Sequence, residues 1–121
     1  IPVAVSTTGV LAGKTAKQLY AADDTICLIA SDDNVYCWGA GTSGQLGNGA
    51  SVNSNIPVAV STTGVLAGKK INQLYSNFGT TCGIASDYNM YCWGANAYGQ
   101  LGNGGSADSS IPVLVTRPNN L

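Results

Sequence analysis

Residues 36–49 read YCWGAGTSGQLGNG, and residues 91–104 read YCWGANAYGQLGNG. The similarity extends outward in both directions: aligning residues 1–55 with residues 56–110 gives 37 identical pairs out of 55. A third copy starts at Ile111 as IPVLVT, where the first two copies begin IPVAVS. Periods of this size are typical of propeller blades and solenoids. The chain is therefore a tandem repeat.

Each period contains four short segments with the composition of β-strands. They are rich in β-branched, aromatic and other apolar residues, and turn-forming residues separate them. In the first repeat we predict strands over residues 2–5, 17–21, 25–30 and 35–38. Four short strands per period predict an all-β chain, a β-propeller with two four-stranded blades. The blades are assigned to residues 1–55 and 56–110, and the partial repeat 111–121 is expected to supply a strand that completes the neighbouring blade in another copy of the chain.

The third and fourth strands of each repeat are predicted to form a tight hairpin. Residues 31–34 read SDDN and residues 86–89 read SDYN. Asp favours the start of a turn, and Asn tolerates a positive φ better than most residues. We therefore expect a type I turn followed by a bulge at Asn34 and at Asn89.

Two cysteines flank this hairpin in each repeat. Nine residues separate Cys27 from Cys37, and nine separate Cys82 from Cys92. The hairpin would place the two sulfur atoms of a pair on facing strands, which predicts one cross-strand disulfide per blade. Buried free thiols are the alternative. A zinc site is disfavoured, since the spacing is too wide and the chain has no His.

The repeated string Tyr-Cys-Trp-Gly followed by Gly-Gln-Leu-Gly-Asn-Gly resembles the regulator of chromosome condensation repeat over the whole chain. The resemblance implies a seven-bladed propeller of four-stranded blades. Family members carry out nucleotide exchange on a small GTPase, contact chromatin or inhibit a β-lactamase, and they share the presentation of loops to a protein partner. The Cys-containing repeat looks like the secreted or surface-displayed bacterial branch, which favours an extracellular or cell-surface location. The family's His before the third strand has no counterpart here.

Composition excludes several classes of function. Five cationic residues spread along the chain, at a net charge of −1, cannot form a nucleic-acid footprint. No apolar run approaches the ~20 residues that span a bilayer, so we expect no membrane insertion. The chain has no His and its six carboxylate side chains are all Asp, which argues against an enzyme. Residues 39–44 match GxGxxG, but no helix can follow, so no cofactor is expected.

Positions that differ between the two repeats are candidates for recognition, because the shared positions specify the blade. The differences gather in the segments 21–24 against 76–79 and 41–43 against 96–98, together with the connectors that follow. Loops tolerate drift, so divergence without a function is the alternative. The candidate partner-binding residues are Asp23, Asp24, Thr42, Ser43, Asn77, Phe78, Asn96 and Tyr98. Of these, we expect Phe78 and Tyr98 to be exposed aromatics, a residue type enriched at binding hot spots. Trp38 and Trp93 recur at one position of the repeat, which predicts packing and not ligand stacking.

Two blades cannot close a ring, because propellers need about 4–8 blades. The uncovered sheet faces predict a homo-oligomer, a trimer of six blades or a tetramer of eight. The most favoured function is a non-enzymatic propeller module that assembles into a closed ring and presents variable loops for protein recognition. The alternatives are a lectin-like glycan binder, a designed or excised propeller fragment with no natural ligand, and a hydrolase that uses the Asp23–Asp24 pair.

Overall fold

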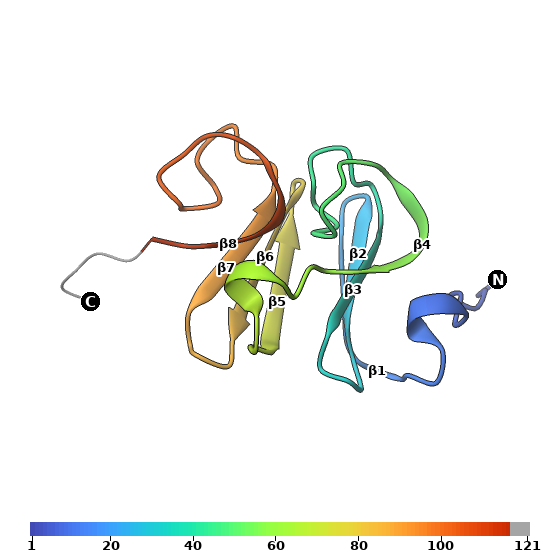
Figure 1. Ribbon diagram of the computed structural model, residues 1–121. Coiled ribbons are helices and arrows are strands. Elements are labelled where there is room, and N and C mark those ends of the chain that lie inside the picture. Colours follow the sequence, from blue (N-terminus) through green and yellow to red (C-terminus); the bar gives the residue numbers. More distant parts are fainter. Residues whose placement is uncertain (117–121) are drawn as a thin grey trace.

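The computed structural model describes residues 1–116 and consists of two antiparallel β-sheets packed face to face (Figure 1). Each sheet has four strands, and a short 3₁₀ turn precedes each sheet in the chain. In chain order the elements are η1 (Gly9–Leu11), β1 (Ala16–Ala22), β2 (Thr25–Ala30), β3 (Val35–Gly39), β4 (Ser54–Ala59), η2 (Gly64–Leu66), β5 (Ile71–Asn77), β6 (Thr80–Ala85), β7 (Met90–Gly94) and β8 (Ser109–Leu114). Within this part of the chain no helix is long and apolar enough to cross a membrane.

Sheet 1 has the strand order β1-β2-β3-β4, and sheet 2 has the order β5-β6-β7-β8. Consecutive strands are neighbours throughout; short turns join the first three strands of each sheet, and a longer connection leads to the fourth. The two cysteines of each repeat face each other in register on the middle strands, Cys27 opposite Cys37 and Cys82 opposite Cys92. Both pairs are disulfides, as the hairpin spacing predicted.

The fourth strand of each sheet differs from the sequence prediction. Residues 2–5 form no strand and are exposed. The equivalent residues of the next repeat form β4 and pair with β3, with Val58 opposite Cys37. Sheet 1 is thus completed by the second Ile-Pro-Val copy and sheet 2 by the third, where Val113 lies opposite Cys92. The physical reason is that each Ile-Pro-Val copy pairs with a strand of the preceding repeat, β3 for the second copy and β7 for the third, and the described residues contain no such strand for the first copy.

This shift also corrects the role given to the partial repeat 111–121. Its strand does not complete a blade of another chain, because β8 pairs with β7 of its own sheet. The end of the repeat, residues 117–121, lies outside the described residues. The surplus Ile-Pro-Val copy is instead the first one, residues 1–5. The sheets therefore span residues 16–59 and 71–114, offset from the repeat boundaries at 55 and 110.

The β2–β3 and β6–β7 turns are tight hairpins, but the left-handed residue lies one position earlier than predicted. Asp33 and Tyr88 each have φ 65°. The Asp33 N–H donates to the Ala30 carbonyl at 2.8 Å, which closes the turn around residues 31–33. The Asn34 N–H donates to Asp32 Oδ1 and the Asn34 carbonyl accepts from the Ala30 N–H, both at 3.0 Å, so Asn34 closes the hairpin just before β3.

The main hydrophobic core lies between the two sheets and not within either one. We call the side of a sheet that faces the preceding repeat its leading face, and the side that faces the following repeat its trailing face. The core joins the trailing face of sheet 1 to the leading face of sheet 2. Its buried members are Cys27, Ile29, Val35, Cys37, Leu46, Val60, Leu66, Ile71, Leu74, Ala85, Tyr91 and Trp93. A smaller cluster on the leading face of sheet 1 contains Leu11, Leu28, Ala30 and Tyr36, with Trp38 packed against it.

Candidate functional site

In each sheet, turns and loops connect the strands at both ends of the sheet. We call the end that carries residues 23–24, 40–53, 78–79 and 95–108 the loop end. The Ala40 N–H donates to the Asp24 carbonyl at 2.8 Å, which brings the long β3–β4 connection beside the β1–β2 turn. The Ala95 N–H makes the same bond to Gly79, at 2.9 Å, in sheet 2. All segments in which the candidate residues were predicted therefore meet at one end of the molecule.

The two short hairpin turns of the loop end contact each other across the sheets. The Phe78 N–H donates to Asp23 Oδ2 at 2.5 Å, although 55 residues separate them. Both residues have a positive φ, 51° for Asp23 and 47° for Phe78. An open notch of about 390 Å³ lies between the turns, and its lining residues include Asp24 and Gln45. Sequence reasoning proposed Asp23 and Phe78 separately, and the structure brings them together.

Two aromatic side chains of the loop end face water. Phe78 is 79% exposed and Tyr98 is 94% exposed, as the sequence predicted for both. Thr42 is exposed as well, and Ser43, which is partly covered, donates its N–H to Gln45 Oε1 at 2.8 Å. Exposed aromatic side chains are enriched at protein interfaces, so these loops have the composition of a recognition surface.

Asn96 cannot contact a partner through its side chain, so this prediction is wrong. The residue is fully buried. Its Nδ2 donates to the carbonyls of Gly105 and Ala107 at 3.1 and 2.8 Å, and its Oδ1 accepts from the Leu101 N–H at 2.9 Å. Asn96 therefore organises the 95–108 connection from inside. Divergence between the repeats indicated that this position matters, but not that its role is structural.

Asn77 is exposed at the end of β5.

Gln45 was not among the residues predicted from the sequence, although it lies at the centre of the contact between the sheets. It is 7% exposed, and its carbonyl accepts hydrogen bonds from Trp93 Nε1 at 3.0 Å and from Thr81 Oγ1 at 3.4 Å. Its counterpart Gln100 is identical in the sequence and is exposed. No local signal distinguishes the two glutamines.

The opposite end of the sheets carries a repeated ionic cluster. Tyr91 OH donates to Asp87 Oδ2 at 2.7 Å, and Lys69 Nζ lies 3.8 Å from the same oxygen. The hydrogen bond from Tyr91 holds the pKa of Asp87 below its ordinary value, and the contact with Tyr91 raises the pKa of Lys69. Lys14, Asp32 and Tyr36 form the same cluster in sheet 1. Because the cluster recurs with the repeat, its role is structural.

The described residues contain no group of three or more His, Cys, Asp or Glu side chains that could hold a metal ion. The four described cysteines are in disulfides and have no free thiol. Several polar side chains of the loop end hydrogen-bond to the backbone of the loops, among them Asn53, Asn96 and Asp108. The loop end therefore presents a polar surface with two exposed aromatic side chains.

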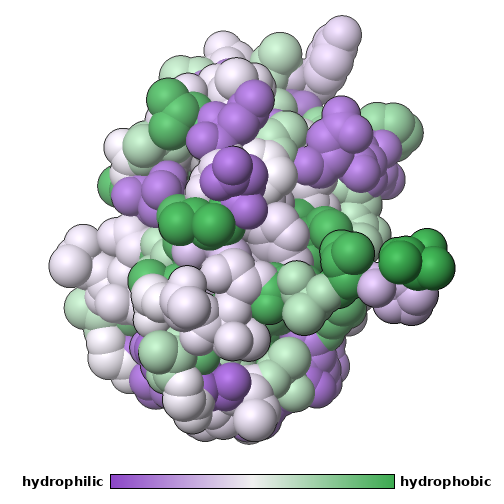
Figure 2. Space-filling model, turned by 90° about the vertical axis from the view of Figure 1, so that its right-hand side faces the viewer, coloured by the Kyte–Doolittle hydropathy of each residue, from purple (hydrophilic) through white to green (hydrophobic). Residues whose placement is uncertain are grey.

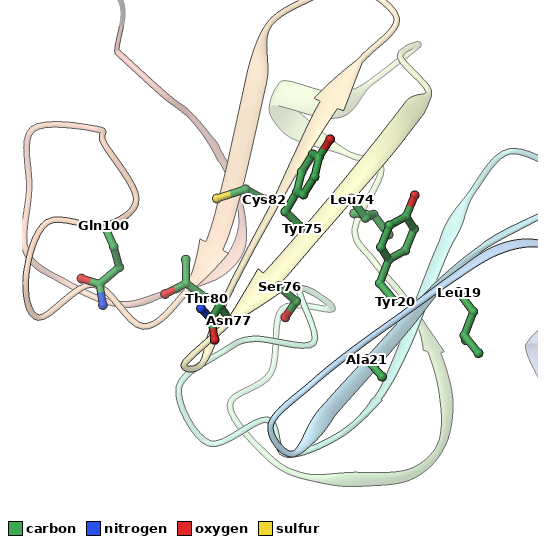
Figure 3. A pocket seen from close by; sticks show the side chains of 10 residues that line it. All are labelled: Leu19, Tyr20, Ala21, Leu74, Tyr75, Ser76, Asn77, Thr80, Cys82 and Gln100. Atoms are coloured by element: carbon green, nitrogen blue, oxygen red, sulfur yellow. The ribbon is translucent and has the colours of Figure 1, made fainter.

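A second exposed surface runs across the two sheets on the side of β1 and β5. The trough there has a volume of about 810 Å³ (Figure 3). Tyr20 and Leu74 approach each other between the sheets, whereas Tyr75 points to the far side of sheet 2. Leu74 is fully buried and Tyr75 is 59% exposed. The trough therefore reaches the uncovered trailing face of sheet 2.

Two four-stranded antiparallel sheets, packed face to face and linked by a strand that each sheet takes from the next repeat, define a pair of propeller blades. The family comparison agrees with this class. The regulator of chromosome condensation (RCC1) repeat matches residues 32–73 and 89–121, and a second form of that repeat matches residues 17–45. The chain belongs to the RCC1 repeat family.

Individual relatives match the chain over a small part of their own length. It is 36% identical to human E3 ubiquitin-protein ligase HERC2 over 88 residues, which is 72% of this chain and 2% of HERC2. It is 29% identical to the ultraviolet-B receptor UVR8 of Arabidopsis thaliana over 106 residues, which is 88% of this chain and 23% of UVR8. The chain thus spans less than a quarter of either relative.

Solved structures show the same fold. Human WBSCR16 superposes with a TM-score of 0.76 at 23% identity, over 86% of this chain and 26% of that one. Yeast RCC1 (Prp20), solved in a complex with Kap60, superposes with a TM-score of 0.67 at 20% identity, over 84% and 25%. A further structure of Prp20p from Saccharomyces cerevisiae is described together with its binding to Gsp1p and histones; its TM-score is 0.66 at 23% identity, over 84% and 25%.

Proposed function

We propose that this chain is a non-enzymatic propeller module whose loop end binds a protein partner. The observation that carries the proposal is the placement of Phe78 and Tyr98. Both are at least 79% exposed, both lie at the loop end, and both occupy positions where two nearly identical repeats differ. Aromatic side chains of this kind dominate the binding energy of many protein interfaces.

The solved relatives support protein recognition as the general role. Prp20 is described in complexes with, or binding to, the proteins Kap60, Gsp1p and histones. An enzymatic role has little support in the loop end, because the Asp23 carboxylate is engaged with the Phe78 N–H and the Thr25 hydroxyl beside Asp24 donates to the Ala40 carbonyl. The loop end therefore favours protein recognition over hydrolysis.

We further propose that copies of the chain complete the propeller. A closed propeller needs about 4–8 blades. Within the described residues no second sheet packs on the leading face of sheet 1, where Leu11 packs with Leu28 and Tyr36, and none packs on the trailing face of sheet 2. Figure 2, which looks at the side of sheet 1 turned away from sheet 2, shows hydrophobic side chains exposed among polar ones on that side. Three chains would give a ring of six blades, and four would give eight.

The two disulfides are compatible with a location outside the cytoplasm, where such bonds persist. We propose an extracellular or cell-surface module.

A binding experiment tests the recognition role. Immobilised wild-type chain, a Phe78→Ala/Tyr98→Ala variant and a Tyr88→Ala control are incubated with extracellular proteins, and retained proteins are purified and titrated individually. Tyr88 is 84% exposed and lies in the β6–β7 turn, outside the loop end. We expect one protein to bind wild type and control, and to bind the double variant at least about tenfold more weakly. A retained protein that binds the wild-type chain, the double variant and the control equally well contradicts the proposal. Glycan-array binding that is lost in the same variant would instead support the lectin alternative.

A further inference from the structure

We infer that the trailing face of sheet 2 docks onto the leading face of sheet 1 of a second copy, in the geometry that joins the two sheets within one chain. This inference rests on the proposed function, because it specifies the contact through which the proposed ring closes. The two faces differ from each other, so the association is head to tail. Head-to-tail contacts form rings when the rotation closes.

Equivalent residues of the two repeats show which faces are made to be covered. On the leading side, Leu74 of sheet 2 is fully buried by sheet 1, whereas its counterpart Leu19 is 62% exposed. On the trailing side, Val35 of sheet 1 is 3% exposed, whereas its counterpart Met90 is 46% exposed. Leu28 and Tyr36 on the leading face of sheet 1 are already buried with Leu11, so the part of that face left exposed is the part around Leu19, which a neighbouring sheet would cover.

The contact inside the chain has a polar anchor that the second contact can reproduce. Trp93 Nε1 donates to the Gln45 carbonyl at 3.0 Å. A Cβ atom on Gly47 would lie 2.7 Å from that Nε1, so a glycine is required beside the indole. The same three residue types recur on the two uncovered faces as Trp38, Gln100 and Gly102. In the docked pair, Trp38 of the second copy would donate to the Gln100 carbonyl of the first.

One contact of the internal junction is absent from the docked pair. Within the chain, Asp23 accepts the Phe78 N–H across the sheets. Sheet 2 has Phe78 where sheet 1 has Asp23, so the first copy offers no carboxylate to the second. The contact between copies is therefore weaker than the contact within a chain, and dilution should dissociate it reversibly.

Outer strands contribute little to the association. In the internal junction the Ser61 N–H donates to the Gly47 carbonyl, and in sheet 2 the Thr116 N–H already occupies the equivalent carbonyl of Gly102. Docking would bring Ser6 of the second copy to the same carbonyl. The third Ile-Pro-Val copy of the first chain and the first copy of the second chain would then compete for the same edge of sheet 2, and one of them must stay unpaired, as residues 1–5 are in the free chain. Docking therefore adds no strand pairing, and burial of the sheet faces drives association.

The test uses charge placed on one face at a time. Leu19→Glu changes the leading face and Met90→Glu changes the trailing face. Val52→Glu is the control, since Val52 at 60% exposure matches Leu19 and the added charge is the same. Sedimentation of the oxidised full-length chain over a range of concentrations measures association. We expect each face variant to associate at least about 100-fold more weakly than wild type, because the junction would bury an unpaired carboxylate. The control should associate like wild type.

Mixing the two face variants tests the orientation. Leu19→Glu keeps an intact trailing face and Met90→Glu keeps an intact leading face, so the mixture should form one-to-one dimers that do not grow further. Wild-type assembly that both variants retain, or a mixture that forms no dimer, overturns the head-to-tail contact but leaves the ring proposal in place. A wild-type chain that remains monomeric at about 1 mM overturns both, and leaves the recognition role of the loop end to its own binding experiment.

Discussion

Leu74 and Leu19 offer a matched pair of substitutions that measures the contact between the two sheets. They occupy the same position of the two repeats, on β5 and β1. Leu74 is fully buried in the core between the sheets, and Leu19 is 62% exposed. The same change, Leu to Ala, therefore removes either a buried or an exposed side chain from the same strand position, with Gly83 opposite Leu74 and Leu28 opposite Leu19.

We expect Leu74→Ala to lower the free energy of unfolding by about 2–5 kcal/mol, the range for a buried leucine that leaves a cavity. Leu19→Ala should lower it by less than about 0.5 kcal/mol, as for most exposed positions. The difference is the effect of sheet 1 on the burial of one side chain of sheet 2.

Urea unfolding with the disulfides intact, extrapolated linearly to zero urea, measures both values. The chain should be kept dilute enough to be monomeric, because association would bury Leu19 as well. Equal losses for the two variants would refute the reasoning, since they would mean that the sheets do not pack against each other. A separate unfolding transition for each sheet would refute it as well.

Three further predictions concern local features. The pKa of Asp87 is lowered by the hydrogen bond from Tyr91, so its contribution to stability is present at neutral pH and is lost as the pH falls from the ordinary value of 3.8 through the lower folded value; the urea midpoints of wild type and Asp87→Asn should converge there, and a constant difference would contradict this. A Cys82→Ser/Cys92→Ser variant loses a cross-link between residues ten positions apart, and its free energy of unfolding should fall by about 2–3 kcal/mol in urea titrations, whereas an unchanged midpoint would show that the bond is dispensable. Phe78→Asn should raise the free energy of unfolding by up to about 1 kcal/mol, and the melting temperature slightly, because Asn tolerates the φ of 47° better than Phe. A lower melting temperature would mean that the Phe ring stabilises the turn.

The strands that pair locally could be predicted from the sequence. The hairpin of β2 and β3 lies within residues 25–39, and the spacing of Cys27 and Cys37 fixed their opposition. The prediction of a strand at residues 2–5 was wrong, because that strand depends on pairing with a distant segment and not on a local hairpin. Its composition is that of a strand, but strand pairing requires an edge, and the edge that takes an Ile-Pro-Val copy belongs to the preceding repeat.

The candidate site shows the same limit. Exposure of Phe78 and Tyr98 followed from their loop positions, whereas the burial of Asn96 depends on how the 95–108 connection folds around it. The bond between Asp23 and Phe78 links residues 55 positions apart and has no local sequence signal.

By itself, the amino-acid sequence determined the repeat, the four-strand unit and the disulfide within each hairpin, since these depend on neighbours along the chain. Only the tertiary structure decided which copy of a repeated residue is buried. Gln45 and Gln100 are the same residue in the same local sequence, yet one lies beneath the next sheet and the other faces water. Burial is a property of what packs against a surface, and two identical segments differ in it whenever only one of them has a neighbour.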